Sequence, residues 1–164
     1  MLNIGQIVIY NTYGVCKVSE IIEKELSGTT KEFYVLHPIN DEKISVFLPL
    51  DNKDLLSRAR PVLSKNEINE VISSFPFQPL YWIDNDNERK KEYNQIIKEG
   101  NRYKLISLIK TIYNHKLSLK DKKKKLHAID EQFYKDAEHL LVDEISYVLN
   151  LNKLDVLKMI QENL

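Results

Sequence analysis

The sequence has few of the residues that mark secreted, metal-binding or membrane-spanning proteins. Its 164 residues include one cysteine, Cys16, which excludes an internal disulfide framework and offers no metal-ligand spacing. No apolar run approaches the roughly 18 residues of a membrane span. The start, "MLNIGQIVIY", lacks the basic flank and apolar core of an export signal. We therefore expect a cytoplasmic protein without a structural metal.

Signatures of catalysis are missing as well. The sequence contains no Gly-rich phosphate loop and no nucleophile elbow. His127 and Asp130 lie one helical turn apart, a spacing that more often gives a surface hydrogen bond than a general base. Cys16 stands in an apolar alternating run, which favours a buried strand residue over a reactive thiol. We predict a protein that is not an enzyme and takes no cofactor or small-molecule substrate.

What the chain does have is charge that is segregated along its length. Hydrophobic residues make up 43%, charged residues 29%, and the net charge is zero, as in an ordinary globular protein. Residues 88–127, however, hold thirteen Lys and Arg against four acids, a net charge of +9, and residues 128–164 carry −5. A basic block of this kind predicts a phosphate-binding surface.

The first part of the chain has the period of β-strands. Residues 6–48 contain the alternating runs "QIVIY", "VCKVSEII", "EFYVLH" and "ISVFLP", which are rich in β-branched and aromatic residues. Turn residues at Gly14, 27–30 and 39–43 separate them. So few strands, without helices between them, must curl to bury one face. Residues 1–62 are therefore predicted to form a small SH3-like or Tudor-like β-barrel.

The second part has the period of helices, so the predicted fold class is α+β with an all-α bundle over residues 63–164. Ser64 and Glu67 form a capping-box pattern. Asp84 or Asp86 is expected to cap the next helix and Gly100 to end it. Further helices are predicted near 102–114, within 126–149 and from Asn152, the last with Leu154, Leu157 and Ile160 facing inward.

Six segments carry a resemblance to a known family. They are "IGQIVIYNTYGVCKVSEI", "KEFYVL", "VFLP", "RARPVLSKNEINEVI", "RKKEYNQIIKEGNRYKLISLIKTIY" and "DEQFYKDAEHLLVDEISYVL". In order and spacing they resemble the CarD family of bacterial transcription regulators, whose N-terminal module is shared with the transcription-repair coupling factor. The resemblance implies a Tudor-like domain over 1–62 that binds the β subunit of RNA polymerase strand against strand. It also implies a helical domain over 63–164 that touches promoter DNA at the upstream edge of the melted region.

The resemblance points to four polymerase-binding residues. Lys24, between Glu23 and Glu25, falls where the family commonly has a basic residue that pairs with acids on the polymerase. Phe47 falls where many members carry an arginine, and an aromatic there can anchor an interface through buried area. The alternatives are that Lys24 is a solvated strand charge and that Phe47 belongs to the barrel core.

The resemblance also points to a DNA-binding surface. Trp82 falls where the family has a tryptophan that stacks as a wedge on a base at the bubble edge. The alternative is a tryptophan packed between barrel and bundle, and "IDND" at 83–86 looks inserted and adds negative charge beside the wedge. The candidate phosphate contacts are Arg89, Lys90, Lys91, Lys98, Arg102, Lys104, Lys122, Lys123, Lys124 and Lys125. Solvated helix faces, or a disordered connection at 122–125, are the competing interpretations.

Together these observations predict a regulator associated with the nucleoid through RNA polymerase, which stabilises the open promoter complex. An interaction adaptor without DNA contact is the alternative from another class. An RNA-binding Tudor-like protein is a remoter third, disfavoured because residues 1–63 hold seven basic residues against eight acids.

Overall fold

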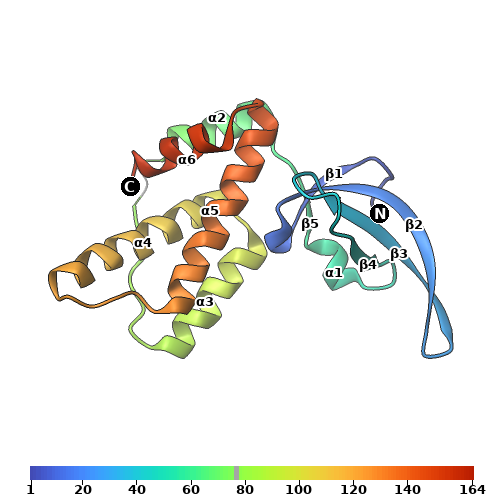
Figure 1. Cartoon of the computed structure of the whole chain (residues 1–164), viewed down its shortest axis with the longest axis horizontal. Coiled ribbons are helices and arrows are strands. Elements are labelled where there is room, and N and C mark those ends of the chain that lie inside the picture. The colour runs from blue at the N-terminus through green and yellow to red at the C-terminus, as the bar shows by residue number, and fades with distance from the viewer. Residues whose placement is uncertain (76–77) are drawn as a thin grey trace. The chain divides into compact units, whose positions relative to one another are not determined.

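The computed structural model describes residues 1–75 and 78–164, which form two compact units, Met1–Val62 and Leu63–Leu164. The first holds the strands and the second the longer helices (Figure 1). The chain is therefore α+β, with an N-terminal antiparallel sheet and a C-terminal helical region. The elements are β1 Ile7–Tyr10, β2 Val15–Leu26, β3 Thr29–Pro38, β4 Val46–Pro49, α1 Lys53–Ser57, β5 Ala59–Pro61, α2 Lys65–Ser73, α3 Asp86–Glu99, α4 Arg102–Asp121, α5 Ala128–Leu149 and α6 Lys153–Gln161.

The sheet is open rather than closed into a barrel. Its strand order is β4-β3-β2-β1-β5, so β4 and β5 are its two outer strands and do not pair with each other. The predicted Tudor-like barrel is therefore not confirmed. The sequence prediction missed α1, whose Leu55 and Leu56 pack against the core of the sheet. A helix that covers the apolar face lets this face be buried without closure of the strands.

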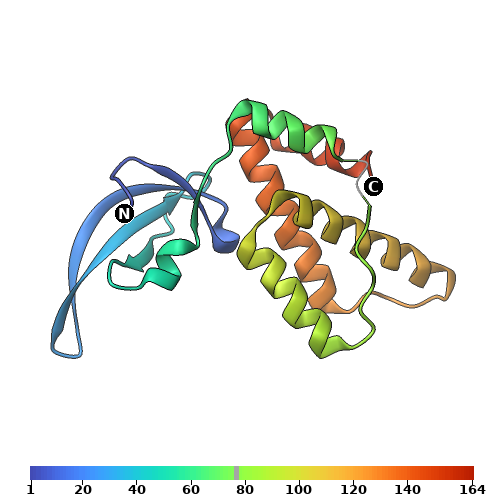
Figure 2. The same cartoon turned by 180° about the vertical axis from the view of Figure 1, so that it is seen from behind.

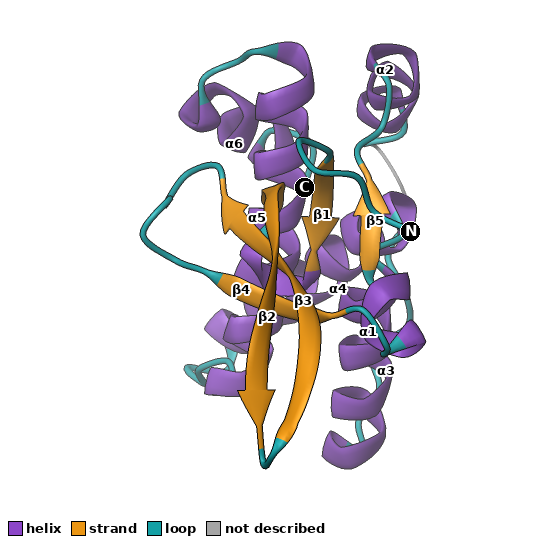
Figure 3. Ribbon diagram, turned by 90° about the vertical axis from the view of Figure 1, so that its right-hand side faces the viewer, coloured by secondary structure: helices purple, strands orange, loops and turns teal. Residues whose placement is uncertain are grey.

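The four predicted strands are present, and β2 and β3 form a long hairpin. Ser27 and Gly28 connect them with φ values of 52° and 78°, the geometry of a two-residue turn between antiparallel strands. β1 pairs only with Val15–Lys17 of β2, and β4 pairs only with Phe33–Leu36 of β3. The hairpin therefore continues past both neighbours as a two-stranded arm (Figure 3).

One face of the sheet forms the core of the N-terminal unit. The buried cluster consists of Val8, Tyr10, Cys16, Val18, Tyr34, Leu36 and Leu48. These side chains alternate with side chains on the opposite face of the sheet, as the period of two requires. On that face Ile9, Val15 and Val35 are buried as well. Cys16 is fully buried, which confirms the prediction that it is a small core residue.

The helices of the second unit begin and end at residues with specific capping roles. Ser64 and Glu67 form the predicted capping box. The cap of α3 is Asn85, between the two predicted aspartates, and its side chain accepts hydrogen bonds from the backbone N–H groups of Asn87 and Glu88. Gly100 ends α3 in the left-handed conformation, as predicted. α4 is longer than expected and continues to Asp121.

The helical unit is built around α5. Figure 2 shows α5 running along α3 and α4, and all three helices contribute to the core. In α6 the buried residues are Val156 and Ile160, whereas Leu154 is 65% exposed. The prediction that Leu154 faces inward was wrong, because Val156 occupies the inward position of the first turn. Over the described residues, no helix has the length and apolar character to cross a bilayer.

Candidate functional site

Lys24 and Phe47 contact each other on the face of the sheet opposite to the core. The Lys24 ammonium lies 3.2 Å from the centroid of the Phe47 ring, close enough for a cation–π interaction. Phe47 is 42% exposed, so it does not belong to the core, and the alternative offered for it is wrong. The two residues come from β2 and β4, on either side of β3. Together they present a cation and an aromatic ring to solvent.

Glu23 and Glu25 lie on the other face of the arm. Successive side chains of a strand point to opposite faces, and the register pairs Glu23 with Glu32 and Lys24 with Lys31. Lys31 is held by Asp51, with 2.8 Å between the ammonium nitrogen and the carboxylate oxygen. The four predicted polymerase-binding residues therefore divide into a cationic, aromatic pair on one face and an acidic pair on the other.

Trp82 packs within the helical unit. Its ring stacks on His115 of α4, with the centroids 3.5 Å apart and the planes 7° from parallel. The Arg89 guanidinium carbon lies 4.5 Å from the centroid of the indole, and Tyr93 of α3 meets the ring edge-on at 6.4 Å. Trp82 is thus half-buried, and its ring contacts are with residues of its own domain.

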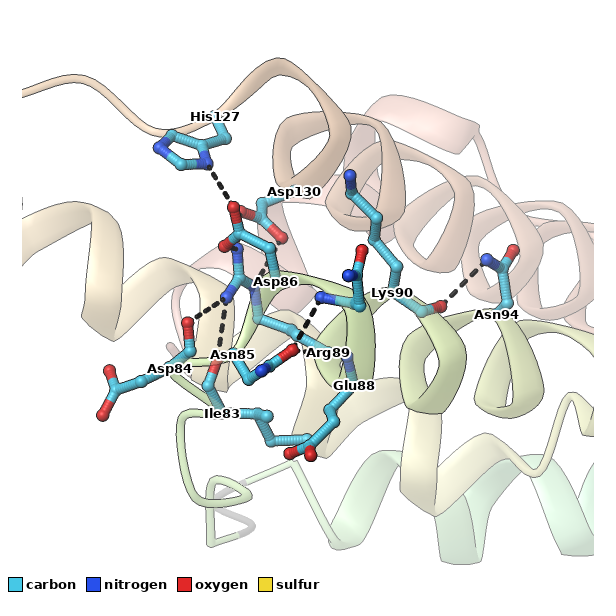
Figure 4. A network of polar contacts seen from close by, with 11 residues as sticks. Ile83, Asp84, Asn85, Asp86, Glu88, Arg89, Lys90, Asn94, His127 and Asp130 are labelled. Atoms are coloured by element: carbon cyan, nitrogen blue, oxygen red, sulfur yellow. Dashed lines mark hydrogen bonds and ion pairs between the residues drawn. The ribbon is translucent and has the colours of Figure 1, made fainter.

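Arg89 is a buried structural residue rather than part of the exposed basic surface. It is 2% exposed, and its Nε and Nη2 atoms donate to both oxygens of Asp130, at 2.9 and 3.0 Å. Nη1 donates to the carbonyl of Ile83 at 2.7 Å, and Nη2 also donates to Asp86 (Figure 4). A DNA phosphate would have to displace these partners, so Arg89 is not available as a phosphate contact in this structure.

Two more predicted phosphate contacts are engaged with acids. Arg102 donates through Nε and Nη2 to Glu144, at 2.8 and 2.6 Å, and Glu144 also accepts from the backbone N–H of Leu63. Glu144 is 4% exposed as a side chain, so this pair joins α4 to α5 below the surface. Lys104 pairs with Glu99 at 2.7 Å, and this contact raises the pKa of the lysine.

The remaining predicted cations are exposed. They are Lys90, Lys91 and Lys98 on α3 and Lys122, Lys123, Lys124 and Lys125 after α4. None of these lysines forms an ion pair with the residues that the structure describes. The run Lys122–Lys125 directly follows α4 and is hydrogen-bonded to its last turn. The backbone N–H groups of Lys123 and Lys124 donate to the carbonyls of Lys120 and Leu119. It therefore concentrates four positive charges at one end of α4, where no acid among the described side chains pairs with them.

A small cavity joins this lysine run to the tryptophan. It has a volume of about 240 Å³, and Trp82, His115, Lys124, Lys125 and Asp84 are among its lining residues. Burial lowers the pKa of His115, and the nearby charge of Arg89 lowers it further. The imidazole is therefore biased towards its neutral form, which stacks on the indole. The cavity brings together aromatic surface, lysine ammonium groups and the exposed carboxylates of Asp84 and Asp86.

The sequence prediction did not identify His115 as the stacking partner of Trp82, and it did not single out Tyr81, which is 95% exposed. It also did not pair His127 correctly. His127 faces Asp86 at 3.9 Å rather than Asp130, which is occupied by Arg89. These contacts join segments distant in sequence, so helical spacing alone could not reveal them.

Comparison with known families agrees with this arrangement. Residues 2–60 match the family described as CarD-like/TRCF RID domain, and residues 82–161 match the family described as CarD, C-terminal domain. No curated protein matches the chain. The two matches follow one another as the two units do, and the family consists of non-enzymatic regulators. The chain therefore belongs to the CarD family of RNA polymerase-interacting transcription regulators.

Proposed function

We propose that this protein binds the β subunit of RNA polymerase through residues 1–62 and promoter DNA through residues 63–164, and thereby stabilises the open complex. It acts without catalysis, in the cytoplasm, at the nucleoid. The observation that carries the proposal is that Lys124, Lys125 and Trp82 line one cavity in the helical unit. Cations beside aromatic rings are what a protein needs to hold phosphates next to unwound bases.

The polymerase docks on the face that carries Lys24 and Phe47. Among the described residues β4 is an outer strand that pairs only with β3, so a strand of the partner can add to its far edge. Phe47 lies on this edge strand, exposed, with the Lys24 ammonium over its ring. The backbone supplies affinity, while the ring and the ammonium select an apolar and acidic partner surface.

Stabilisation of the open complex follows from differential binding. A ligand shifts an equilibrium only by the difference between its affinities for the two states. Lysines bind the phosphates of any sequence, whereas aromatic stacking requires unpaired bases. A preference of about 1.4 kcal/mol for melted over paired DNA changes the open population about tenfold.

The polymerase half of the proposal is tested with the purified β subunit. We expect Lys24→Glu combined with Phe47→Glu to weaken binding of the full chain by about tenfold or more, since both changes fall on the docking face. A second variant, Glu23→Gln with Glu25→Gln, changes the other two predicted polymerase-binding residues, which lie on the opposite face of the same arm. If the polymerase docks on the face of Lys24 and Phe47, this variant should bind as wild type does. Equal binding by wild type and the Lys24/Phe47 variant, with the fold intact, would refute this docking face.

The DNA half is tested by the salt dependence of promoter binding. Lys124→Gln with Lys125→Gln is expected to reduce the slope of log affinity against log salt by up to about two, because each phosphate contact contributes about 0.9. The control is Lys135→Gln with Lys158→Gln, which removes two exposed lysines from α5 and α6. The first variant should also shorten the lifetime of the open complex with polymerase.

One observation favours the alternative of an adaptor without DNA contact. Tyr147, Leu151 and Leu154 are 42%, 41% and 65% exposed around the α5–α6 connection. Exposed apolar residues gathered in one region are typical of protein-binding surfaces. If the Lys124/Lys125 variant keeps the salt slope and the open-complex lifetime of wild type, the adaptor replaces DNA contact as the function of the helical unit.

A further inference from the structure

Tyr81 is held out into solvent by the residues on either side of it. It is 95% exposed, and it forms no side-chain hydrogen bond or ring contact with the described part of the chain. The backbone N–H of Leu80 donates to the Thr111 hydroxyl at 2.7 Å, while Trp82 is stacked on His115. Both anchors belong to α4, so the tyrosine projects from a fixed backbone.

Trp82, by contrast, has its ring engaged. The indole is stacked at 3.5 Å on His115, contacts the Arg89 guanidinium at 4.5 Å and meets the edge of Tyr93. Arg89 itself is fixed by Asp130. For Trp82 to stack on a base, the indole would have to leave His115 and uncover the buried ion pair. Stacking of a base by Trp82 therefore carries an energetic penalty that stacking by Tyr81 does not.

The surroundings of Tyr81 fit a nucleic acid strand. Its neighbour Trp82 lines the same cavity as Lys124 and Lys125, neither of which has an ion-pair partner among the described residues. Lysine ammonium groups bind backbone phosphates, and the phenol ring at the chain position next to Trp82 offers a flat, exposed surface to a base. Of the acids at this cavity, Asp86 is engaged by Arg89, while Asp84 is exposed and opposes phosphate binding. The cavity lining holds Arg89, Lys124 and Lys125 against Asp84, Asp86 and Asp130, so its formal charges balance. The excess positive charge beside it comes from Lys122 and Lys123 of the same lysine run.

We infer that Tyr81, rather than Trp82, stacks on an unpaired base of the DNA, while Lys124 and Lys125 contact phosphates of the same strand. The inference rests on the proposed function and names the residue that makes its binding selective for melted DNA. In this arrangement Trp82 is a positioning residue: its stack on His115 fixes the backbone from which Tyr81 projects. An intact duplex offers no free base face, so Tyr81 contributes only where the strands are open.

The test uses the full chain and two labelled DNA probes, a fully paired duplex and the same duplex with an unpaired central segment. Binding is followed by fluorescence anisotropy. We expect Tyr81→Ala to weaken binding to the second probe by about fivefold or more, the lower end of stacking by one aromatic ring, and to leave binding to the paired duplex unchanged. Tyr81→Phe keeps the ring and should bind as wild type does. Tyr147→Ala, which removes another exposed tyrosine, is the matched control.

The outcomes separate the inference from the function beneath it. If wild type prefers the unpaired probe and Tyr81→Ala keeps the whole preference, the assignment of Tyr81 is wrong while the DNA contact stands. A loss of preference in Trp82→Phe but not in Tyr81→Ala would return the role to Trp82. If wild type binds neither probe with salt-sensitive affinity, both the inference and the DNA half of the proposed function are overturned.

Discussion

Removal of the Asp130 carboxylate is expected to destabilise the helical domain strongly. Asp130 and Arg89 are 1% and 2% exposed, and two hydrogen bonds of 2.9 and 3.0 Å join them between α5 and α3. In Asp130→Ala the guanidinium stays buried and keeps only Asp86 and backbone carbonyls as partners. Loss of one partner of a buried ion pair costs about 3–5 kcal/mol. The cost applies here because the buried guanidinium is left with only the half-exposed Asp86 as a counter-charge.

The matched variant removes both charges. Arg89→Met with Asp130→Leu replaces the pair by apolar side chains, and such replacements are often close to neutral. We therefore expect the double variant to lie within about 1.5 kcal/mol of wild type. The coupling energy between the two positions should then be about 2 kcal/mol or more, as for contacting residues in one network.

Urea unfolding followed by tryptophan fluorescence measures these free energies. Trp82 is the one tryptophan of the chain and lies beside Arg89, so its emission reports the helical domain separately from the sheet. A loss below about 1 kcal/mol in Asp130→Ala, the size of a surface ion pair, would refute the reasoning. The reasoning would also be refuted if the double variant lost as much free energy of unfolding as Arg89→Met and Asp130→Leu lose together when each is measured alone. A folded double variant should also bind DNA as wild type does, since Arg89 faces its partners and not solvent.

Three further predictions concern single positions. Gly100→Ala should destabilise the helical domain by about 1 kcal/mol or more in urea unfolding, because φ is 54° there; Gly100→Asn, which tolerates this conformation, should lose less. Burial lowers the pKa of His115 in the folded protein. In the unfolded chain the histidine has its ordinary pKa of about 6.5, so below that pH the unfolded state binds the proton more readily. Stability is therefore expected to fall as the pH drops below about 6.5. In His115→Gln the urea midpoint should decrease less between neutral and acidic pH than it does in wild type. An equal decrease in both proteins would contradict the role given to His115. Asp84→Asn removes a carboxylate from the cavity of Lys124 and Lys125 and should raise DNA affinity about two- to threefold at low salt, measured by anisotropy.

The features of the fold that could be predicted from sequence are those fixed by local chemistry. Alternating apolar residues gave the four longer strands, and the Ser64 capping box and the Gly100 helix end were identified from single residues. Barrel closure could not be obtained in this way, because it depends on whether two strands distant in sequence pair. Here α1 covers the core with Leu55 and Leu56, and the two outer strands stay apart.

The candidate site was predicted less well, because sequence shows which residues are charged but not what they contact. Asp130 and Glu144 fall among the buried positions of α5, near Phe133 and Ile145. An acid at such a position needs a buried cationic partner, and this was the available signal that Arg89 and Arg102 are not solvated. No comparable signal indicated that Trp82 would be stacked while its neighbour Tyr81 stays exposed.

The basic and acidic segments that are separate in the sequence therefore lie together in the folded helical unit. The acidic segment after residue 127 is not a separate surface, because α5 packs on α3 and α4 and three of its acids pair with cations of the basic block: Asp130 with Arg89, Glu131 with Lys116 and Glu144 with Arg102. These pairs hold the bundle together and cannot also neutralise phosphates. The four charges of Lys122–Lys125 follow the end of α4, where no described acid pairs with them. Among the described residues, folding thus leaves two groups of exposed lysines without ion pairs, Lys90, Lys91 and Lys98 on α3 and the run Lys122–Lys125. The second group borders the cavity that Trp82 lines.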